Sequence, residues 1–227
     1  VIARALTAIA ALAFAGPAHA QTGGIQVAPV VVEMTPERSF GSVRVRNARA
    51  RSTAFEIDVY AWTQVNGEDV LTPTDALIVA PGVFEMAPGA EQVVRVGAIA
   101  PGRERETAFR IILRELPTQS TSGARLGFTL EMSLPVFVTP DGAEASVMAS
   151  PEAGSMLTVA NVGAAHARMI SVEGVNTGAV EAPRYLLAGA EAALTLPPRT
   201  REVRMRFYQD GQAAERIVQV GDADSRP

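Results

Sequence analysis

The segment formed by residues 126–137, LGFTLEMSLPVF, constrains the fold of this chain more than any other part of the sequence. Every second residue from position 126 to position 134 is apolar: Leu126, Phe128, Leu130, Met132 and Leu134. Successive side chains of a β-strand point to opposite faces, so strict alternation is typical of a strand with one apolar face. This segment is therefore predicted to be a strand.

The rest of the sequence also has the pattern of an all-β protein. Short alternating or apolar runs recur between turn residues, and 19 glycines and 15 prolines leave little room for long helices. Before the Asp141-Gly142 turn signal, strands are predicted at residues 25–34, 42–47, 54–64, 92–98, 108–116 and 126–138. After it, strands are predicted at residues 156–161, 167–175, 192–196, 202–208 and 217–220.

A faint internal repeat predicts two domains of one kind. VRVRN at residues 43–47 and LTVAN at residues 157–161 each end a predicted strand in asparagine, and small residues follow. A chain of 227 residues is long enough for two ordinary domains. Two β-sandwiches with a boundary near residues 139–145 are the simplest interpretation.

Composition excludes several function classes. The formal net charge of −4 gives no electrostatic reason to expect nucleic acid or an anionic membrane surface as a partner. The absence of cysteine excludes disulfides, thiol nucleophiles and thiolate metal sites. All 20 basic residues are arginine, and 48% hydrophobic residues are enough for a packed core.

Residues 1–20 have the features of a secretory signal peptide. Arg4 precedes an apolar run at residues 5–15, and Ala18-His19-Ala20 has small residues at the two positions that a signal peptidase requires. A buried N-terminal helix is the alternative interpretation. No other segment approaches the length of a membrane span, so export without membrane insertion is predicted.

The sequence has few candidates for catalysis. His166 is the one histidine beyond the signal segment, and its AAHARM context is typical of a strand, which favours a structural role. No metal-ligating spacing and no phosphate-binding glycine loop occurs, so no catalytic residue, metal site or cofactor is predicted. Trp62 is interpreted as a core aromatic residue. A binding protein is the expected class.

Several motifs together resemble the PapD-like periplasmic chaperones of the chaperone–usher pilus pathway, with features of their archaic, alternative branch. The motifs are FRIILRELP at 109–117, PVFV at 135–138, IQVAPVVVEM at 25–34 and QVVRV at 92–96, with looser matches such as MRFYQDG at 205–211. The resemblance implies two immunoglobulin-like β-sandwiches in tandem. Residues 21–140 would form the N-terminal domain and residues 141–227 the C-terminal domain.

The resemblance also implies a mechanism, donor-strand complementation, which is a known case of strand addition. The chaperone lends the alternating strand to a pilin subunit that lacks one strand, and its apolar side chains fill the groove of the subunit. The implied groove-filling residues are Leu126, Phe128, Leu130, Met132 and Leu134. An ordinary strand with one core face is the alternative. Val27, Val30 and Val32 of the first strand form the implied second clamp, or are plain core residues.

One departure from the family pattern concerns the basic residues that hold the C-terminal carboxylate of the subunit. The family has an arginine in the first strand and a lysine at the end of the donor strand, where this sequence has Val31 and Pro135. Arg95 and Arg110 are the candidate replacements, with surface arginines as the alternative. Glu106 and Asp210 match acids that link the two domains in the family, and Thr139 stands where their arginine partner is expected.

The resemblance implies a periplasmic protein that binds a fimbrial subunit and delivers it to an outer-membrane usher, without enzyme activity or cofactor. It leaves open whether the free protein caps its own donor strand as a homodimer. The alternative from another class is a secreted structural or adhesive sandwich that is itself an assembly component.

Overall fold

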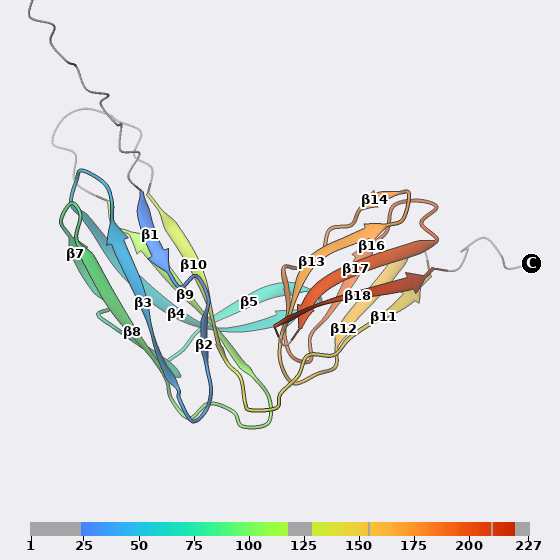
Figure 1. The fold of residues 1–227 in the computed structure, drawn as a ribbon, viewed down its shortest axis with the longest axis horizontal. Helices are drawn as coiled ribbons and strands as arrows, with labels where there is room; N and C mark the ends of the chain where they lie inside the picture. Colours follow the sequence, from blue (N-terminus) through green and yellow to red (C-terminus); the bar gives the residue numbers. More distant parts are fainter. Residues whose placement is uncertain (1–23, 118–128, 154, 210, 221–227) are drawn as a thin grey trace, which may run out of the picture.

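A computed structural model describes residues 24–117, 129–153, 155–209 and 211–220, and these form two β-sandwich lobes set at an angle (Figure 1). Strands β1 to β10 build the first lobe and β11 to β18 the second. The predicted all-β architecture is confirmed. Across these ranges no helix is long and apolar enough to span a membrane.

The N-terminal lobe consists of two sheets that pack face to face. The four-stranded sheet has the order β1 (Ile25–Ala28), β3 (Phe40–Asn47), β8 (Glu91–Ala98), β6 (Leu77–Ala80). The six-stranded sheet has the order β2 (Val32–Met34), β10 (Glu131–Val138), β9 (Thr107–Glu115), β4 (Thr53–Val65), β5 (Glu68–Pro73), with β7 (Val83–Met86) also paired to β4.

The single first strand predicted at residues 25–34 is wrong, because the chain forms two strands in different sheets there. β1 pairs antiparallel with β3, whereas β2 pairs parallel with β10. The chain crosses from one sheet to the other at Pro29, which has no N–H to contribute to a ladder. A second crossing occurs at Pro81, between β6 and β7. Each crossing lets one segment of chain border both sheets.

Alternation along the strands places the apolar side chains between the two sheets. Phe55, Phe109 and Val136 are at most 2% exposed, and they belong to one continuous core cluster. Their neighbours in sequence point to the outer faces. The period of two seen in the sequence therefore decides which face of each strand is buried.

The C-terminal lobe is a smaller sandwich of the same kind. One sheet has the order β11 (Val147–Glu152), β12 (Met156–Asn161), β16 (Glu191–Thr195). The other has the order β14 (Gly178–Ala179), β13 (Ala167–Gly174), β17 (Glu202–Gln209), β18 (Gln212–Gln219), with β15 (Tyr185–Leu186) also paired to β13. Leu157, Met205 and Phe207 lie in its core.

The internal repeat marks two equivalent buried asparagines. Asn47 ends β3 and Asn161 ends β12, and each side-chain amide donates to backbone carbonyls while its oxygen accepts from backbone N–H groups. The backbone matches as well. Asn47 exchanges hydrogen bonds with Gly89 and Ala90 as Asn161 does with Gly189 and Ala190. The two asparagines therefore join the same pair of strands in each lobe.

The sequence gave no signal for several strands. β5 has all six residues exposed, so it lacks the apolar face on which the prediction relied. β6, β7, β11, β14 and β15 were missed too, since each is short or is exposed at most of its positions. Strands without a continuous apolar face are recruited by pairing with a neighbour that has one.

Replacing Asn161 by alanine is expected to destabilise the protein by about 2–4 kcal/mol, because buried backbone groups would lose their partners. The side chain is 1% exposed and bonds to Ala165 and Leu186 carbonyls at 2.7 and 3.0 Å. Urea unfolding followed by circular dichroism measures the change. The exposed Gln219→Ala is the control, expected within about 0.5 kcal/mol of wild type. Equal stability of the two variants would contradict the structural role.

Candidate functional site

Strand β10 has one edge that is only partly covered. On one side it pairs with β9 along its whole length, from Glu131 to Val138. On the other side β2 pairs with Val136–Val138 only. Among the described strands, none pairs with the outer edge at residues 131–135. That stretch is an available template for another strand.

The direction of the backbone groups follows from the pairing with β9. Glu115 N–H donates to the Leu130 carbonyl at 2.8 Å, so residue 130 turns its backbone groups toward β9. Because alternate residues of a strand face opposite edges, Glu131 and Ser133 turn their N–H and C=O groups outward. Pro135 falls on the same open edge, where its missing N–H breaks no ladder bond.

The apolar side chains of this stretch fall into two groups. Leu130 and Met132 are partly exposed, and Met132 packs against the edge of the core cluster. Leu134 is 5% exposed and belongs to that core, so its side chain is not free to fill a partner's groove. Leu126 and Phe128 lie outside the described residues.

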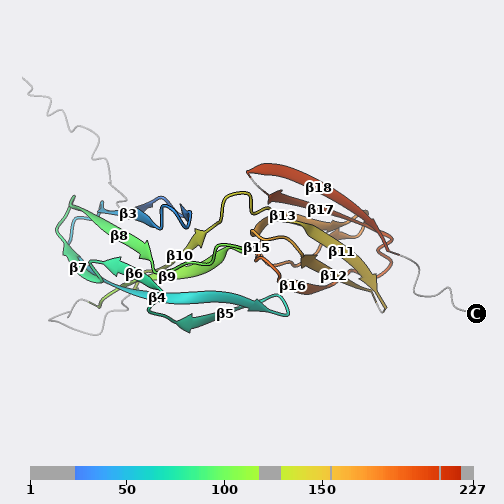
Figure 2. The same ribbon diagram turned by 90° about the horizontal axis from the view of Figure 1, so that it is seen from below.

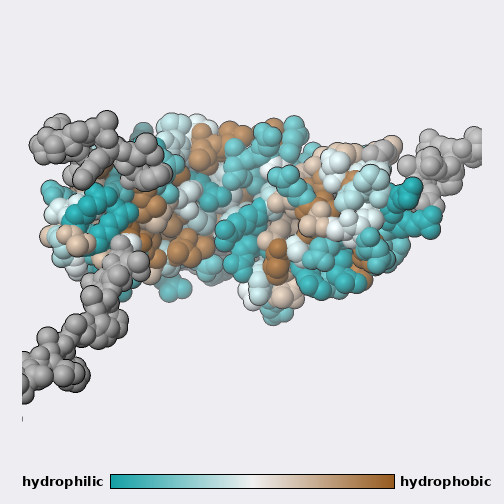
Figure 3. Space-filling model, turned by 90° about the horizontal axis from the view of Figure 1, so that it is seen from above, coloured by the Kyte–Doolittle hydropathy of each residue, from teal (hydrophilic) through white to brown (hydrophobic). Residues whose placement is uncertain are grey.

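The first-strand residues also differ from one another. Val30 is 64% exposed in the segment between β1 and β2, whereas Val32 is 3% exposed and is a core residue paired with Val136. Val27, on β1, is half-buried against the core. Seen from the side on which the angle between the lobes opens, patches of hydrophobic surface lie among hydrophilic ones on the N-terminal lobe (Figure 3).

A buried carboxylate fixes the point where the chain enters β10. The Glu115 side chain is 3% exposed and accepts hydrogen bonds from Arg49 at 2.7 Å and Arg51 at 2.8 Å. Its second oxygen accepts from the Leu130 N–H at 3.2 Å. Glu115 therefore links the end of β9, the β3–β4 turn and the residue preceding β10.

The pKa of Glu115 is lowered overall. Burial by itself acts to raise this pKa, but the hydrogen bonds from Arg49 and the Leu130 N–H, together with the charges of Arg49 and Arg51, outweigh it. The folded state thus favours the carboxylate, and ionisation of Glu115 stabilises this junction.

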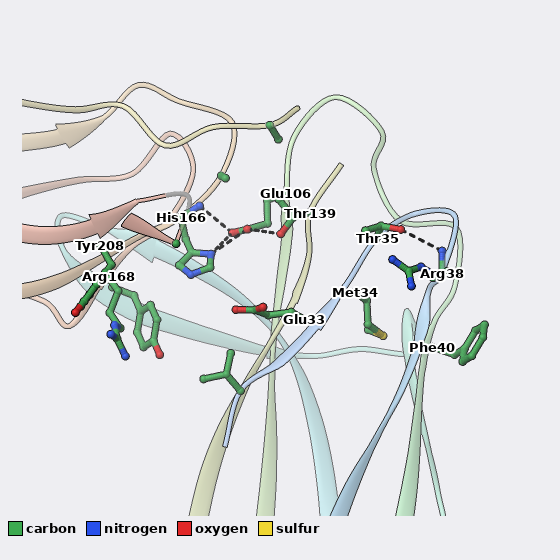
Figure 4. Close-up of a pocket in the computed structure, with 15 residues that line it drawn as sticks. Glu33, Met34, Thr35, Arg38, Phe40, Glu106, Thr139, His166, Arg168 and Tyr208 are labelled. Atoms are coloured by element: carbon green, nitrogen blue, oxygen red, sulfur yellow. Dashed lines mark hydrogen bonds and ion pairs between the residues drawn. The ribbon is translucent and has the colours of Figure 1, made fainter. Parts of the chain in front are cut away.

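The angle between the lobes contains a pocket of about 1020 Å³, lined from both sides (Figure 4). Val31, Glu33, Arg38 and Phe40 contribute from the N-terminal lobe. His166, Arg168, Tyr185 and Tyr208 contribute from the C-terminal lobe. The guanidinium of Arg168 lies 4.6 Å from the centre of the Tyr208 ring. Neither Arg38 nor Arg168 forms an ion pair with a described residue.

The two arginines predicted as carboxylate anchors lie elsewhere. Arg110 stacks on Trp62, with its guanidinium carbon 3.7 Å from the ring centre, and pairs with Asp69 at 3.2 Å. Burial lowers the pKa of Arg110, although the charge of Asp69 opposes that effect. Arg95 is exposed on β8, in the other sheet. Neither residue lines the pocket, and the structure does not bring them together.

Glu106 joins the lobes, through a different partner from the arginine of the family pattern. Its side chain is 1% exposed and accepts from the Thr139 hydroxyl at 2.7 Å. His166 contacts the same carboxylate through its backbone N–H at 3.1 Å and through Nδ1 at 2.9 Å. Asp210 lies outside the described residues. His166 thus has a structural partner, and its ring stacks on Phe137 at 3.7 Å.

Sequence reasoning missed Arg38 and Arg168 as pocket residues. Arg168 occupies an exposed position of β13 and Arg38 the turn between β2 and β3, and nothing in either local sequence indicates that the lobes face each other there. Within the described ranges, no group of histidine, aspartate and glutamate side chains is arranged to hold a metal ion.

The fold and the partly open β10 edge define the class of two-sandwich assembly chaperones, and family comparison agrees. Residues 24–144 match the model of the pili and flagellar-assembly chaperones, PapD N-terminal domain. This chain belongs to that family. No curated protein sequence matches it significantly.

Solved structures show the same fold at low sequence identity. The SafB chaperone of Salmonella enterica, in complex with the SafA pilin, aligns with a TM-score of 0.70 at 15% identity, over 86% of this chain and 96% of the other. The Escherichia coli chaperone DraB aligns with a TM-score of 0.67 at 15% identity, over 88% and 97%. The CsuC–CsuE chaperone–tip subunit complex from archaic chaperone–usher Csu pili of Acinetobacter baumannii aligns with a TM-score of 0.62 at 16% identity, over 76% and 90%.

Replacing Glu115 by glutamine is expected to lower the free energy of unfolding at pH 7 by about 1–3 kcal/mol, because two arginines lose their charged partner. The lowered pKa sets the sign of the pH dependence. The stabilisation is complete above the ordinary carboxyl pKa of about 4.3 and is lost as the pH falls through the lower folded value. Urea unfolding between pH 7 and pH 3 measures it.

In that series the difference between wild type and Glu115→Gln should shrink toward the acid end. Glu131→Gln removes an exposed partner of Arg114 and is the matched control, expected to change stability by less than about 1 kcal/mol. A difference between wild type and Glu115→Gln that stays constant from pH 7 to pH 3 would refute the role of the ionised carboxylate.

Proposed function

We propose that this protein is a periplasmic chaperone that holds a fimbrial or pilus subunit by lending it the open edge of β10. The observation that carries the proposal is the unpaired edge at residues 131–135, beside the partly exposed side chains of Leu130 and Met132, in a chain of the pilus-chaperone family. Leu126 and Phe128 would extend the same apolar row.

The physical benefit to the subunit is the covering of an exposed groove and of unpaired backbone groups. A sandwich that lacks one strand has open sheet edges and apolar surface, and such a surface aggregates. Strand addition satisfies the backbone groups and sets register and direction. Burying the Leu130 and Met132 side chains is worth about 3–6 kcal/mol in all, before the costs of association.

Val30 is the residue of the first strand that best fits a second contact with the subunit, since it is the one of the three predicted valines that is mostly exposed. Val32 and Leu134 support the site from within the core. Their packing holds β2 and the end of β10 together and thereby limits the open edge to the stretch before Val136.

The carboxylate of the subunit's C-terminus is assigned in this proposal to Arg168, with Arg38 across the pocket. Both line the space between the lobes, and neither is committed to an acid among the described residues. A guanidinium offers a bidentate pair of donors to a carboxylate. Arg110 is less suited, because Trp62 and Asp69 already occupy its guanidinium.

Delivery to an outer-membrane usher completes the proposal, with release when a strand of the next subunit replaces β10. Exchange of one strand for a better-fitting one supplies the free energy, so neither a cofactor nor an enzymatic step is required. Family membership supports this part of the proposal.

Introducing charge at the partly exposed apolar positions is expected to abolish subunit binding. The double variant Leu130→Glu, Met132→Glu is compared with wild type by periplasmic co-expression with the candidate subunit encoded beside it, followed by co-purification. A one-to-one complex is expected for wild type and at least about a hundredfold weaker binding for the variant, since two buried apolar contacts become desolvated charges.

The matched control, Thr129→Glu, Ser133→Glu, adds the same charge at exposed alternate positions of the same segment and should retain binding. Binding by all three proteins alike would eliminate β10 as the donor strand. Absence of any complex with wild type would favour the alternative of a structural or adhesive sandwich.

Replacing Arg168 by alanine is expected to weaken subunit binding about tenfold or more, because a charge-assisted hydrogen bond contributes about 1.5–3 kcal/mol. Titration calorimetry with purified subunit measures the affinity, and the exposed Arg95→Ala is the control that should bind as wild type does. A subunit whose C-terminus carries three extra residues should show the loss already with wild type. If it still distinguishes Arg168 from alanine, the carboxylate is not the group that Arg168 holds.

A further inference from the structure

The hairpin of β4 and β5 leaves the N-terminal sandwich and reaches the C-terminal lobe (Figure 2). β4 is 13 residues long, and its last part pairs with β5 only. Asn66 and Gly67 form the two-residue turn, both with positive φ, at 52° and 82°. This is the turn that suits the twist of a tight hairpin.

Gln64 binds the hairpin to the backbone of the C-terminal lobe. Its Nε2 donates to the Tyr185 carbonyl at 2.8 Å, and its Oε1 accepts from the Leu187 N–H at 2.9 Å. Nε2 also donates to Asp69 of β5 at 2.9 Å. One side chain thus acts like a short strand segment added beside residues 185–187.

Gly67 lies directly against β16 of the C-terminal lobe. A Cβ atom added at this glycine would be 2.7 Å from the Ala192 Cβ and 3.2 Å from its Cα. Carbon atoms do not approach so closely without displacing one another. The tip of the hairpin therefore fits the C-terminal lobe with no space for even one methyl group.

An aromatic cluster fixes the base of the hairpin to the same lobe. Trp62 is 3% exposed and belongs to the core cluster of the C-terminal lobe, with its ring 5.5 Å from Tyr185. Arg110 covers the other side of the indole and pairs with Asp69 of β5. Both functions of Arg110 thus concern the position of the hairpin.

These contacts lie apart from the joint between Glu106 and His166. A joint at one place permits rotation of two sandwiches about it, and relative motion of domains is the default where an interface is small. A second set of contacts, from Trp62 through Gln64 to Gly67, restrains that rotation. The pocket needs both lobes in register, because its walls come from both.

We infer that Gln64 and Gly67 are positioning residues that hold the C-terminal lobe at the angle required to form the interdomain pocket. The effect on the angle is a property of this chain alone. The effect on subunit affinity rests on the proposed function. Disturbing the tip of the hairpin changes the angle, and thereby weakens binding, without touching β10 or the pocket.

The absence of cysteine makes the angle directly measurable. Ser42→Cys and Ser150→Cys, at exposed positions of β3 and β11, carry the only two spin labels, and pulsed electron paramagnetic resonance reports the distance distribution between the lobes. Gly67→Ala is expected to shift or broaden the distribution. Gly89→Ala is the matched control, since Gly89 also has a positive φ, 76°, but has no atom within 4 Å of an added Cβ.

A compensating change separates the contact from backbone strain. Ala192→Gly removes the closest atom and should restore the wild-type distribution to Gly67→Ala. Gln64→Leu removes both hydrogen bonds to the C-terminal lobe and should broaden the distribution by an independent route. Subunit affinity is expected to fall about tenfold with the changed angle and to return with the compensating change, within the range of ordinary coupling free energies.

A wild-type distance distribution in both Gly67→Ala and Gln64→Leu would overturn the inference, and so would failure of Ala192→Gly to restore it. If wild type binds no subunit, the proposed function fails, while the distance distributions still decide the role of the hairpin. Changed distributions with unchanged subunit affinity would overturn the link between the angle and binding.

Discussion

The pairing of β10 is the constraint on which the rest of this structure depends. Its last three residues are held on both edges, by β9 and β2, whereas residues 131–135 are held on one edge only. The same strand thus supplies core residues such as Leu134 and Phe137 and keeps an open ladder of backbone groups. Glu115 and its two arginines hold the beginning of this stretch in place. Because an open edge is otherwise an aggregation hazard, its shortness and its polar alternate residues limit the risk.

The two lobes are joined by contacts of different physical character. Glu106, Thr139 and His166 form a compact polar joint, and a buried carboxylate of this kind is stable only while its hydrogen bonds are satisfied. The β4–β5 hairpin adds close steric fit and an amide that pairs with backbone. Between these contacts the pocket brings Arg38 and Arg168 to opposite walls. Their position gives a reason why a chain with Val31 and Pro135 at the expected basic positions can still offer cations in the cleft.

Much of the fold could be predicted from the sequence, and the errors have clear causes. Alternation identified β10 and the main core strands, and the two asparagines at the ends of β3 and β12 marked the repeat that the hydrogen bonds confirm. A single strand at residues 25–34 was wrong because a continuous apolar run does not reveal a change of sheet. β5 was missed because no face of it is buried. Arg95 and Arg110 were placed by their strands, but neither lines the cleft, and Arg110 is occupied by Trp62 and Asp69.

The sequence by itself determined what local periodicity and residue chemistry determine: the β class, the inward faces of the strands, the buried asparagine turns, and the absence of thiol chemistry. The tertiary structure alone decided which residues of the alternating strand remain partly exposed, since burial of Leu134 depends on the opposite sheet. It also decided the surroundings of Arg168 and Gly67, because these residues meet their neighbours across the two lobes. Periodicity reports on the neighbours of a residue along one strand, whereas contacts between lobes arise from positions far apart in the chain, and no local pattern encodes them.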